Sequence, residues 1–234
     1  MRTPASRIGA HVQNVRFADR TEAGEALSRA LEGYRLGGGV VLAIPRGGIP
    51  VGAQVARHLG MAASAIVACK VPAPGHPELG MGAVAEGGVR QVDLGLASVL
   101  KVAPGELRNA VLAAEEELKK RILLYRQGCP VPDLQGCAAV LVDDGIARGV
   151  TMRAAIEAVK RLRPARLLVA APVASAFAAD SLVGMVDEVV TLIRPAVLRS
   201  VSEWYEDFSP VRDADVMEWL AAGRRSESGE PAVA

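Results

Sequence analysis

The sequence is poor in aromatic residues, with only eight among its 234 positions. A core built from this chain must therefore be aliphatic, and the chain supplies runs of Val, Leu, Ile and Ala such as residues 40–44 and 138–142. Continuous aliphatic runs are typical of strands that are buried on both faces of a parallel sheet. Three of the eight aromatics, Trp204, Tyr205 and Phe208, are concentrated near the C-terminus.

Cysteine is also scarce, because the chain has three cysteines, an odd number, and no pair in CxxC spacing. Cys69, Cys129 and Cys137 are therefore expected to be reduced residues and neither a disulfide framework nor a zinc site. The three histidines, at positions 11, 58 and 76, do not cluster in the sequence. We expect no histidine-based metal site.

Long hydrophobic runs and an excess of charge of one sign are absent as well. The most apolar stretch, residues 167–179, is too short to span a bilayer, and residues 1–15 contain no apolar segment of the secretory type. The 27 basic residues nearly balance the 26 acidic ones, which argues against nucleic-acid binding through bulk charge. These features predict a cytoplasmic protein that binds neither membranes nor nucleic acid.

The order of predicted elements favours a single α/β domain over residues 1–223, followed by a loose polar tail over 224–234. Helices are expected from Asp19, over 50–58, 104–126, 151–162 and 176–183, and strands over 40–44, 65–70, 138–144, 167–171 and 188–193. Alternating aliphatic strands and helices predict a doubly wound parallel sheet.

Two segments outside this alternation have distinct patterns. Residues 71–88 contain three prolines and five glycines, which predicts a long loop or a loop with a short hairpin. In the helix over 104–126, Glu and Lys or Arg recur at i, i+4 at positions 115–121. We interpret this charge run as a solvated helix face, although it could also bind a ligand.

The end of the strand over 138–144 carries the strongest functional signal. Asp143 and Asp144 follow a buried run, and residues 145–151 then lead through two glycines into a helix. Backbone N–H groups and a helix N-terminus there can bind a phosphate, while the two carboxylates can accept hydrogen bonds from ribose hydroxyls. The alternative is an ordinary turn in which an Asp caps the helix.

Two further strand ends carry cations. Arg46, Gly47 and Gly48 follow the strand over 40–44, and the glycines allow the backbone to approach an anion closely while Arg46 offers a bidentate donor. Lys70 ends the strand over 65–70. A plain turn and a lysine directed at solvent are the corresponding structural alternatives.

These segments resemble the type I phosphoribosyltransferases. The acid pair and residues 145–152 resemble the family's signature for phosphoribosyl pyrophosphate (PRPP), and residues 45–48 resemble its pyrophosphate loop. The segments 70–84, 125–126, 171–174 and 204–208 extend the resemblance, over about residues 17–220, to a subgroup whose acceptor is unassigned. The implied fold is a doubly wound parallel sheet with a small hood and a long flexible loop that closes over the site.

The resemblance also implies chemistry and residue roles. The family transfers the 5-phosphoribosyl group from PRPP to a nitrogen acceptor, such as a nucleobase, with Mg²⁺ bound through PRPP, and a homodimer is a further expectation. Asp143 and Asp144 would then hold the ribose, and Lys70, Arg46, Gly47 and Gly48 the pyrophosphate. The 5′-phosphate would bind to the cradle formed by Gly145, Ile146, Ala147, Arg148, Gly149, Val150 and Thr151.

One residue departs from the family's pattern, because Arg148 stands where the usual loop has a Thr whose hydroxyl helps to bind the 5′-phosphate. Arg148 makes a PRPP- or nucleotide-binding regulatory protein with weak or no catalysis the alternative function. A phosphatase or isomerase with Asp143 as nucleophile is a weaker alternative, since the segment lacks DxD spacing. Trp204 and Tyr205 could stack on a planar acceptor, or the aromatic group could simply pack a C-terminal segment.

Overall fold

The computed structural model of the chain describes residues 16–34, 36–127 and 130–228. Its central sheet has five parallel strands in the order β2 (Ala62–Ala65), β1 (Val40–Ala43), β6 (Ala138–Val142), β7 (Arg166–Val173) and β8 (Glu188–Ile193). The predicted doubly wound parallel sheet is confirmed. Cys129 and the histidine at position 11 lie outside the described residues.

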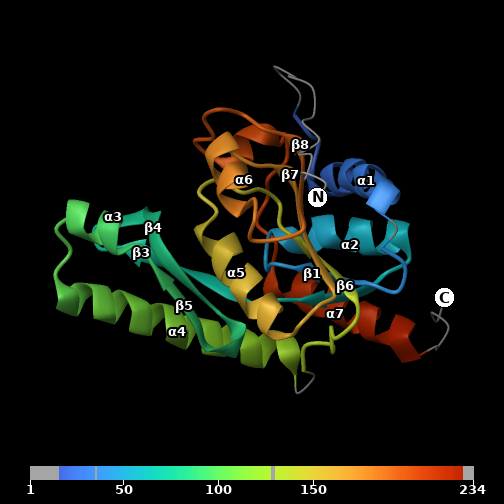
Figure 1. Cartoon of the computed structure of the whole chain (residues 1–234), viewed down its shortest axis with the longest axis horizontal. Coiled ribbons are helices and arrows are strands. Elements are labelled where there is room, and N and C mark those ends of the chain that lie inside the picture. Colours follow the sequence, from blue (N-terminus) through green and yellow to red (C-terminus); the bar gives the residue numbers. More distant parts are fainter. Residues whose placement is uncertain (1–15, 35, 128–129, 229–234) are drawn as a thin grey trace.

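Helices cover both faces of this sheet (Figure 1). Val41, Val140 and Leu168 face α1 (Arg20–Leu31) and α2 (Gly48–Leu59), whereas the alternate positions Leu42 and Leu141 face α5 (Val150–Arg161) and α6 (Ala176–Leu182). Successive strand residues point to opposite faces, so a run without polar residues is needed to fill both layers. The aliphatic runs noted in the sequence therefore form the middle layer of the fold.

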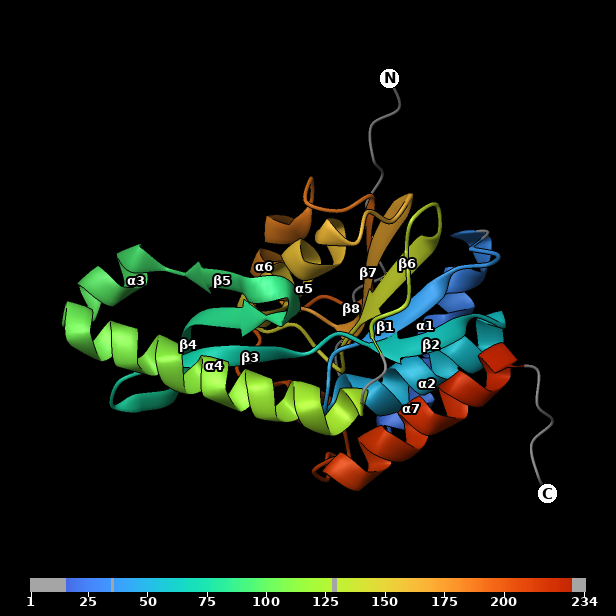
Figure 2. The same ribbon diagram turned by 90° about the horizontal axis from the view of Figure 1, so that it is seen from below.

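A second unit extends from the side of the sheet, as both views show (Figures 1 and 2). It consists of the antiparallel strands β3 (Ala68–Ala73), β4 (His76–Ala85) and β5 (Val89–Val92), with α3 (Leu94–Val99) and the long α4 (Pro104–Arg126). The hairpin expected as one alternative for residues 71–88 is present, but it is long and takes up almost the whole stretch, whereas the alternative of a loop alone is wrong. The expected strand over 65–70 is also two strands, which belong to different sheets.

The proline and glycine content of this hairpin is accommodated at particular positions. Pro72 lies where the β3–β4 register shifts, and a Cβ atom on Gly82 would lie 2.3 Å from the carbonyl oxygen of Gln91 on β5. These residues therefore permit a bulge and a close strand approach here instead of breaking the strands.

The remaining elements are short, apart from the last helix. The 3₁₀ turns are η1 (Glu32–Tyr34), η2 (Glu86–Gly88) and η3 (Val201–Trp204), and α7 spans Asp213–Ser228. The predicted tail over 224–234 therefore begins inside a helix, while residues 229–234 lie outside the described part. No helix in the described ranges is long and apolar enough to cross a membrane.

A buried ion pair ties the second unit to the central sheet. Arg126, the last residue of α4, donates from Nε and Nη2 to the two carboxylate oxygens of Glu86 at 2.9 and 2.6 Å. Nη2 also donates to the carbonyl oxygen of Ala65 at the end of β2, and the Val67 N–H donates to Glu86 Oε2. The pair satisfies backbone groups at the point where the chain leaves one sheet for the other.

We expect Arg126→Leu to lower the free energy of unfolding by about 3 kcal/mol, because it leaves the Glu86 carboxylate buried without its cation. Urea unfolding would measure this change. The double variant Arg126→Leu with Glu86→Leu serves as the comparison, and it should recover part of the loss. A cost below about 1 kcal/mol for the single variant would contradict a structural role for the pair.

Candidate functional site

The loops after β1 and β6 meet at the carboxyl edge of the central sheet. A Cβ atom on Gly47 would lie 2.1 Å from Asp144 Oδ2, and one on Gly48 would lie 2.8 Å from the carbonyl oxygen of Val142. Only glycine allows this approach, so the predicted pyrophosphate loop packs directly on the predicted acid pair. The peptide bond between Pro45 and Arg46 is cis.

The two adjacent carboxylates have different surroundings. Asp143 lines two adjoining cavities, and its Oδ1 accepts a hydrogen bond from the Asp144 N–H at 2.9 Å. The Asp144 side chain lines neither cavity; its Oδ2 lies 2.8 Å from Nε of Arg20. The structure thus offers Asp143 to a ligand and keeps Asp144 in a buried ion pair.

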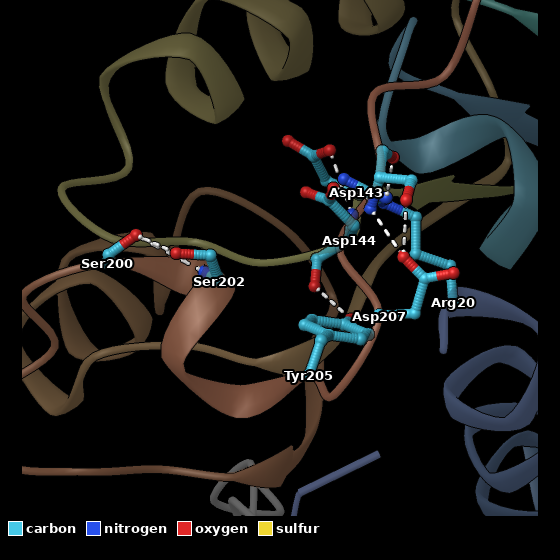
Figure 3. Close-up of polar contacts among 8 residues, drawn as sticks. Arg20, Asp143, Asp144, Ser200, Ser202, Tyr205 and Asp207 are labelled. Atoms are coloured by element: carbon cyan, nitrogen blue, oxygen red, sulfur yellow. Dashed lines mark hydrogen bonds and ion pairs between the residues drawn. The ribbon is translucent and has the colours of Figure 1, made fainter. Parts of the chain in front are cut away.

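Arg20, which the sequence interpretation did not single out, organises this side of the site (Figure 3). Its Nη1 donates to the carbonyl oxygen of Ser209 at 2.9 Å, and its guanidinium carbon lies 3.7 Å from the ring centroid of Phe208. Arg20 is buried on the same stripe of α1 as Leu27 and Leu31. A charged residue on an apolar helix stripe is the sequence signal that could have identified it.

Burial changes the acidity of the pair. Loss of solvation, followed by repulsion from Asp144, raises the pKa of Asp143 well above its ordinary value. Burial also raises the pKa of Asp144, while the Arg20 guanidinium acts in the opposite direction. The free site therefore holds a strongly desolvated carboxyl at Asp143, next to a carboxylate that has its own cation.

The loop between β6 and α5 forms the wall of the first cavity, whose volume is about 220 Å³. All seven residues of the predicted phosphate cradle, 145–151, line this cavity, together with Lys70 and Asp143. Gly149 caps α5 with φ +72°, and Ser175 Oγ donates to the carbonyl oxygen of Ala147 at 2.6 Å. The cradle is held in place by α6 and opens at the N-terminus of α5, where backbone N–H groups favour an anion.

The predicted cations are placed differently from one another. Lys70, on β3, lines both cavities, and its Nζ donates to the carbonyl oxygen of Glu78 at 3.3 Å. Arg46 lines neither cavity, because its Nη1 lies 3.6 Å from Asp213 Oδ1 of α7. The Tyr125 hydroxyl donates to the same Asp213 oxygen. Arg148 is exposed at the rim of the first cavity.

The aromatic group lies behind the acid pair. The Tyr205 ring is buried beside Phe17 and Phe208, and its hydroxyl donates to the carbonyl oxygen of Asp144 at 2.6 Å. Burial raises the pKa of this hydroxyl, so it stays a donor. The expectation that Tyr205 stacks on an acceptor is therefore wrong, since its ring faces the protein interior. Trp204 is half-buried in the same cluster, and its indole N–H is buried without a hydrogen-bond partner in the described structure.

Comparison with known protein families identifies a family that this sequence matches. The sequence model of the phosphoribosyl transferase domain matches residues 20–190, which include Arg20, Asp143, Asp144 and the whole cradle. The chain belongs to the phosphoribosyl transferase family.

Individual relatives support the same assignment. Two strains of Mycobacterium tuberculosis have a protein provisionally named a phosphoribosyl transferase, which is 34% identical over 214 residues, covering 89% of this chain. The match covers 47% of those proteins, so the chain spans about half the length of the curated relatives it matches. The crystal structure of TT1426 from Thermus thermophilus is 39% identical with a TM-score of 0.73, and the match covers 89% of this chain and 99% of that one.

The raised pKa of Asp143 predicts a stability that depends on pH. The folded state holds this proton more tightly than the unfolded chain, so the stability falls as pH rises from the unfolded pKa through the folded one. Asp143→Asn removes this effect and leaves an oxygen that can accept from the Asp144 N–H. We expect this phosphoribosyl transferase variant to be more stable than wild type at pH 7, by on the order of 1 kcal/mol.

Urea unfolding between pH 4 and 8 would measure the difference, which should shrink towards pH 4. Asp215→Asn is the matched control: Asp215 lies on the surface of α7 and pairs with Arg212, so its replacement should show no such gain. Equal or lower stability of Asp143→Asn at pH 7 would count against a desolvated carboxyl at this position.

Proposed function

We propose that the chain transfers the 5-phosphoribosyl group from PRPP to a nitrogen acceptor and releases pyrophosphate. The observation that carries this proposal is the position of Asp143 beside the seven-residue anion cradle at the N-terminus of α5. A carboxylate repels a phosphate, so the combination suits a ligand with both a phosphate and hydroxyl groups. The 5-phosphoribosyl group has both.

Each part of PRPP has a counterpart in the site. The backbone amides of residues 145–151 would bind the 5′-phosphate, and Asp143 would accept hydrogen bonds from the ribose hydroxyls. Lys70 and the amides of Gly47 and Gly48 would face the pyrophosphate. Arg46 would join them by leaving Asp213, a solvent-exposed contact of 3.6 Å that costs little to break. Asp144 would position Gly47 and Asp143 without touching PRPP.

In the proposed reaction one bond forms and one bond breaks. The protein would hold the reactants in position and supply charges that stabilise the transition state. The lone pair of the acceptor nitrogen forms a bond to C1 of the ribose while the C1–O bond breaks. Pyrophosphate leaves with the bonding electrons, and the proton on the acceptor nitrogen passes to water. Positive charge develops on the ribose ring as the bond breaks, and the carboxylate of Asp143 would stabilise it in its poorly solvated position.

Magnesium would reach this site with PRPP. Among the described residues there is no group of three or more His, Cys, Asp or Glu side chains that could hold a metal ion by itself. We propose that Mg²⁺ is held through the oxygens of PRPP. When bound, the ion would neutralise charge on the leaving group.

A second candidate function is a PRPP-binding regulator with weak or no catalysis, and Arg148 is the observation that favours it. In the structure Arg148 is exposed and lies on the rim of the cradle. Its guanidinium can then assist a phosphate from outside without occupying the position of the phosphate. The presence of an Arg in place of the family's usual Thr thus favours a regulator, whereas its exposed position favours the enzyme, and substitution of Arg148 distinguishes the two functions.

The first test of the proposed function is PRPP binding by titration calorimetry in the presence of Mg²⁺. We expect Asp143→Asn to weaken binding roughly ten- to hundredfold, because the amide nitrogen cannot accept a hydroxyl hydrogen bond and the charge is lost. Asp215→Asn is again the control and should bind as wild type does. Unchanged PRPP affinity in Asp143→Asn would refute the assignment of the ribose site.

The second test is Arg148→Thr, which restores the residue expected from the family's pattern. With Arg148 on the rim, we expect the affinity for PRPP to stay similar or to fall a few-fold. A gain of tenfold or more in affinity or turnover would show that Arg148 blocks the cradle in solution, and would favour the regulatory function. Arg29→Thr, at an exposed position on α1 that lines neither cavity, controls for the loss of a surface charge.

A further inference from the structure

A second cavity adjoins the phosphate cradle, and most of the residues that line it take no part in the proposed binding of PRPP. Its volume is about 540 Å³, and it lies between the loop after β1, the hairpin of β3 and β4, and α4. We call it the α4 cavity. Figure 2 shows α4 running beneath the hairpin towards the central sheet. The α4 cavity shares Lys70, Asp143 and Thr151 with the first cavity, so ligands in the two cavities would lie side by side.

The walls of the α4 cavity are mainly apolar. Ala110, Ala113 and Ala114 form one wall, and the prolines at positions 72 and 77 come from the hairpin on the other side. The spacing of the α4 residues places them on one helical face, which continues to Glu117 and Arg121. Walls with such small side chains leave room for a planar ring.

The polar groups of the α4 cavity are few and mostly engaged. Arg121 Nε donates to Glu117 Oε1 at 2.8 Å, so this cation has its own carboxylate. Lys70 lies at the boundary between the cavities, where the proposed function uses it for pyrophosphate. Asp143, Glu117 and the Thr151 hydroxyl remain as acceptors, and Cys69 adds a weakly polar thiol. The charged residues at positions 115–121 are expected from the sequence to form a solvated helix face. One of their ion pairs, Glu117–Arg121, lines the α4 cavity instead.

We propose that the α4 cavity binds the acceptor, and that the acceptor is a neutral planar nitrogen heterocycle without a carboxylate, with an N–H group that donates to Glu117. This inference rests on the proposed function. A neutral ring matches the apolar walls, whereas the multiply charged pyrophosphate does not. A carboxylated ring would find no cation that is not already paired or used for the leaving group. An acceptor in this cavity lies beside Asp143, where the ribose is placed.

The first experiment measures pyrophosphate release from PRPP with two sets of probes at equal concentration. Adenine, hypoxanthine, uracil and nicotinamide are the neutral set, and orotate, nicotinate and anthranilate are the carboxylated set. We expect turnover with at least one neutral probe and at least tenfold lower turnover with every carboxylated one. Turnover that is best with a carboxylated probe would overturn the inference.

The second experiment fills the α4 cavity. Ala113→Phe should raise the KM of the active neutral probe at least tenfold and leave the Kd of PRPP within twofold of wild type. The matched control is Leu112→Phe, at the neighbouring exposed position on α4 that does not line the cavity. If Ala113→Phe and Leu112→Phe behave alike, the acceptor does not bind in the α4 cavity.

The third experiment tests the hydrogen bond from the acceptor. Glu117→Gln keeps an oxygen for Arg121 Nε but removes the charge, and we expect it to raise the KM of the neutral probe about tenfold with little change in kcat. Glu116→Gln is the control, because Glu116 pairs with Lys119 and does not line the cavity. An unchanged KM in Glu117→Gln would remove Glu117 from the acceptor site.

Failure of the inference can be distinguished from failure of the proposed function. If the wild-type protein does not bind PRPP, or binds it without turnover on any probe, the proposed transfer fails and the inference fails with it. If PRPP binds and turnover occurs, the variants alone decide whether the α4 cavity holds the acceptor.

Discussion

The ion pair between Arg20 and Asp144 is the interaction on which the rest of the site depends. It fixes the direction of one carboxylate and thereby leaves its neighbour, Asp143, facing the cavities. The same carboxylate packs against Gly47, so the loop after β1 takes its position from it. Such a pair is costly to bury, and its formation here is supported by the Ser209 carbonyl and the Phe208 ring on Arg20.

A second group of polar contacts, which combines the buried Arg126–Glu86 ion pair with a partly exposed hydrogen bond, sets the geometry of the α4 cavity. Arg126 holds the end of α4 on Glu86 and Ala65, while Tyr125 holds it on Asp213 of α7. Since α4 forms one wall of the cavity and the hairpin forms the opposite wall, these anchors determine the width between them. Asp213 also contacts Arg46, which connects the anchor of α4 to the predicted pyrophosphate loop.

The sequence predicts those features that depend on local pattern. The parallel sheet follows from aliphatic runs, and the cradle follows from an acid pair and glycines at a strand end, all of which are contiguous. The length of the hairpin is not predicted, because Pro72 and Gly82 break strands in general and are tolerated here only through a bulge and a close neighbour. The divergence of Asp143 and Asp144, the burial of Tyr205 and the α4 cavity depend on residues far apart in the chain, which no local pattern reveals.

The site joins distant parts of the chain, so the order in which these parts are synthesised limits when the site can form. Arg20 meets Asp144 across 124 positions and Ser209 across 189 positions. The Phe17 N–H donates to the carbonyl oxygen of Trp204, the last residue of η3, and the Glu206 N–H donates to the carbonyl oxygen of Phe17. During synthesis, the guanidinium of Arg20 therefore emerges from the ribosome long before either of its partners. The central strands can pair earlier, and Arg20 can meet Asp144 once β6 has emerged. Arg20 gains its contacts with Phe208 and Ser209 only after residue 209 has been added, so this side of the binding site is completed late in synthesis.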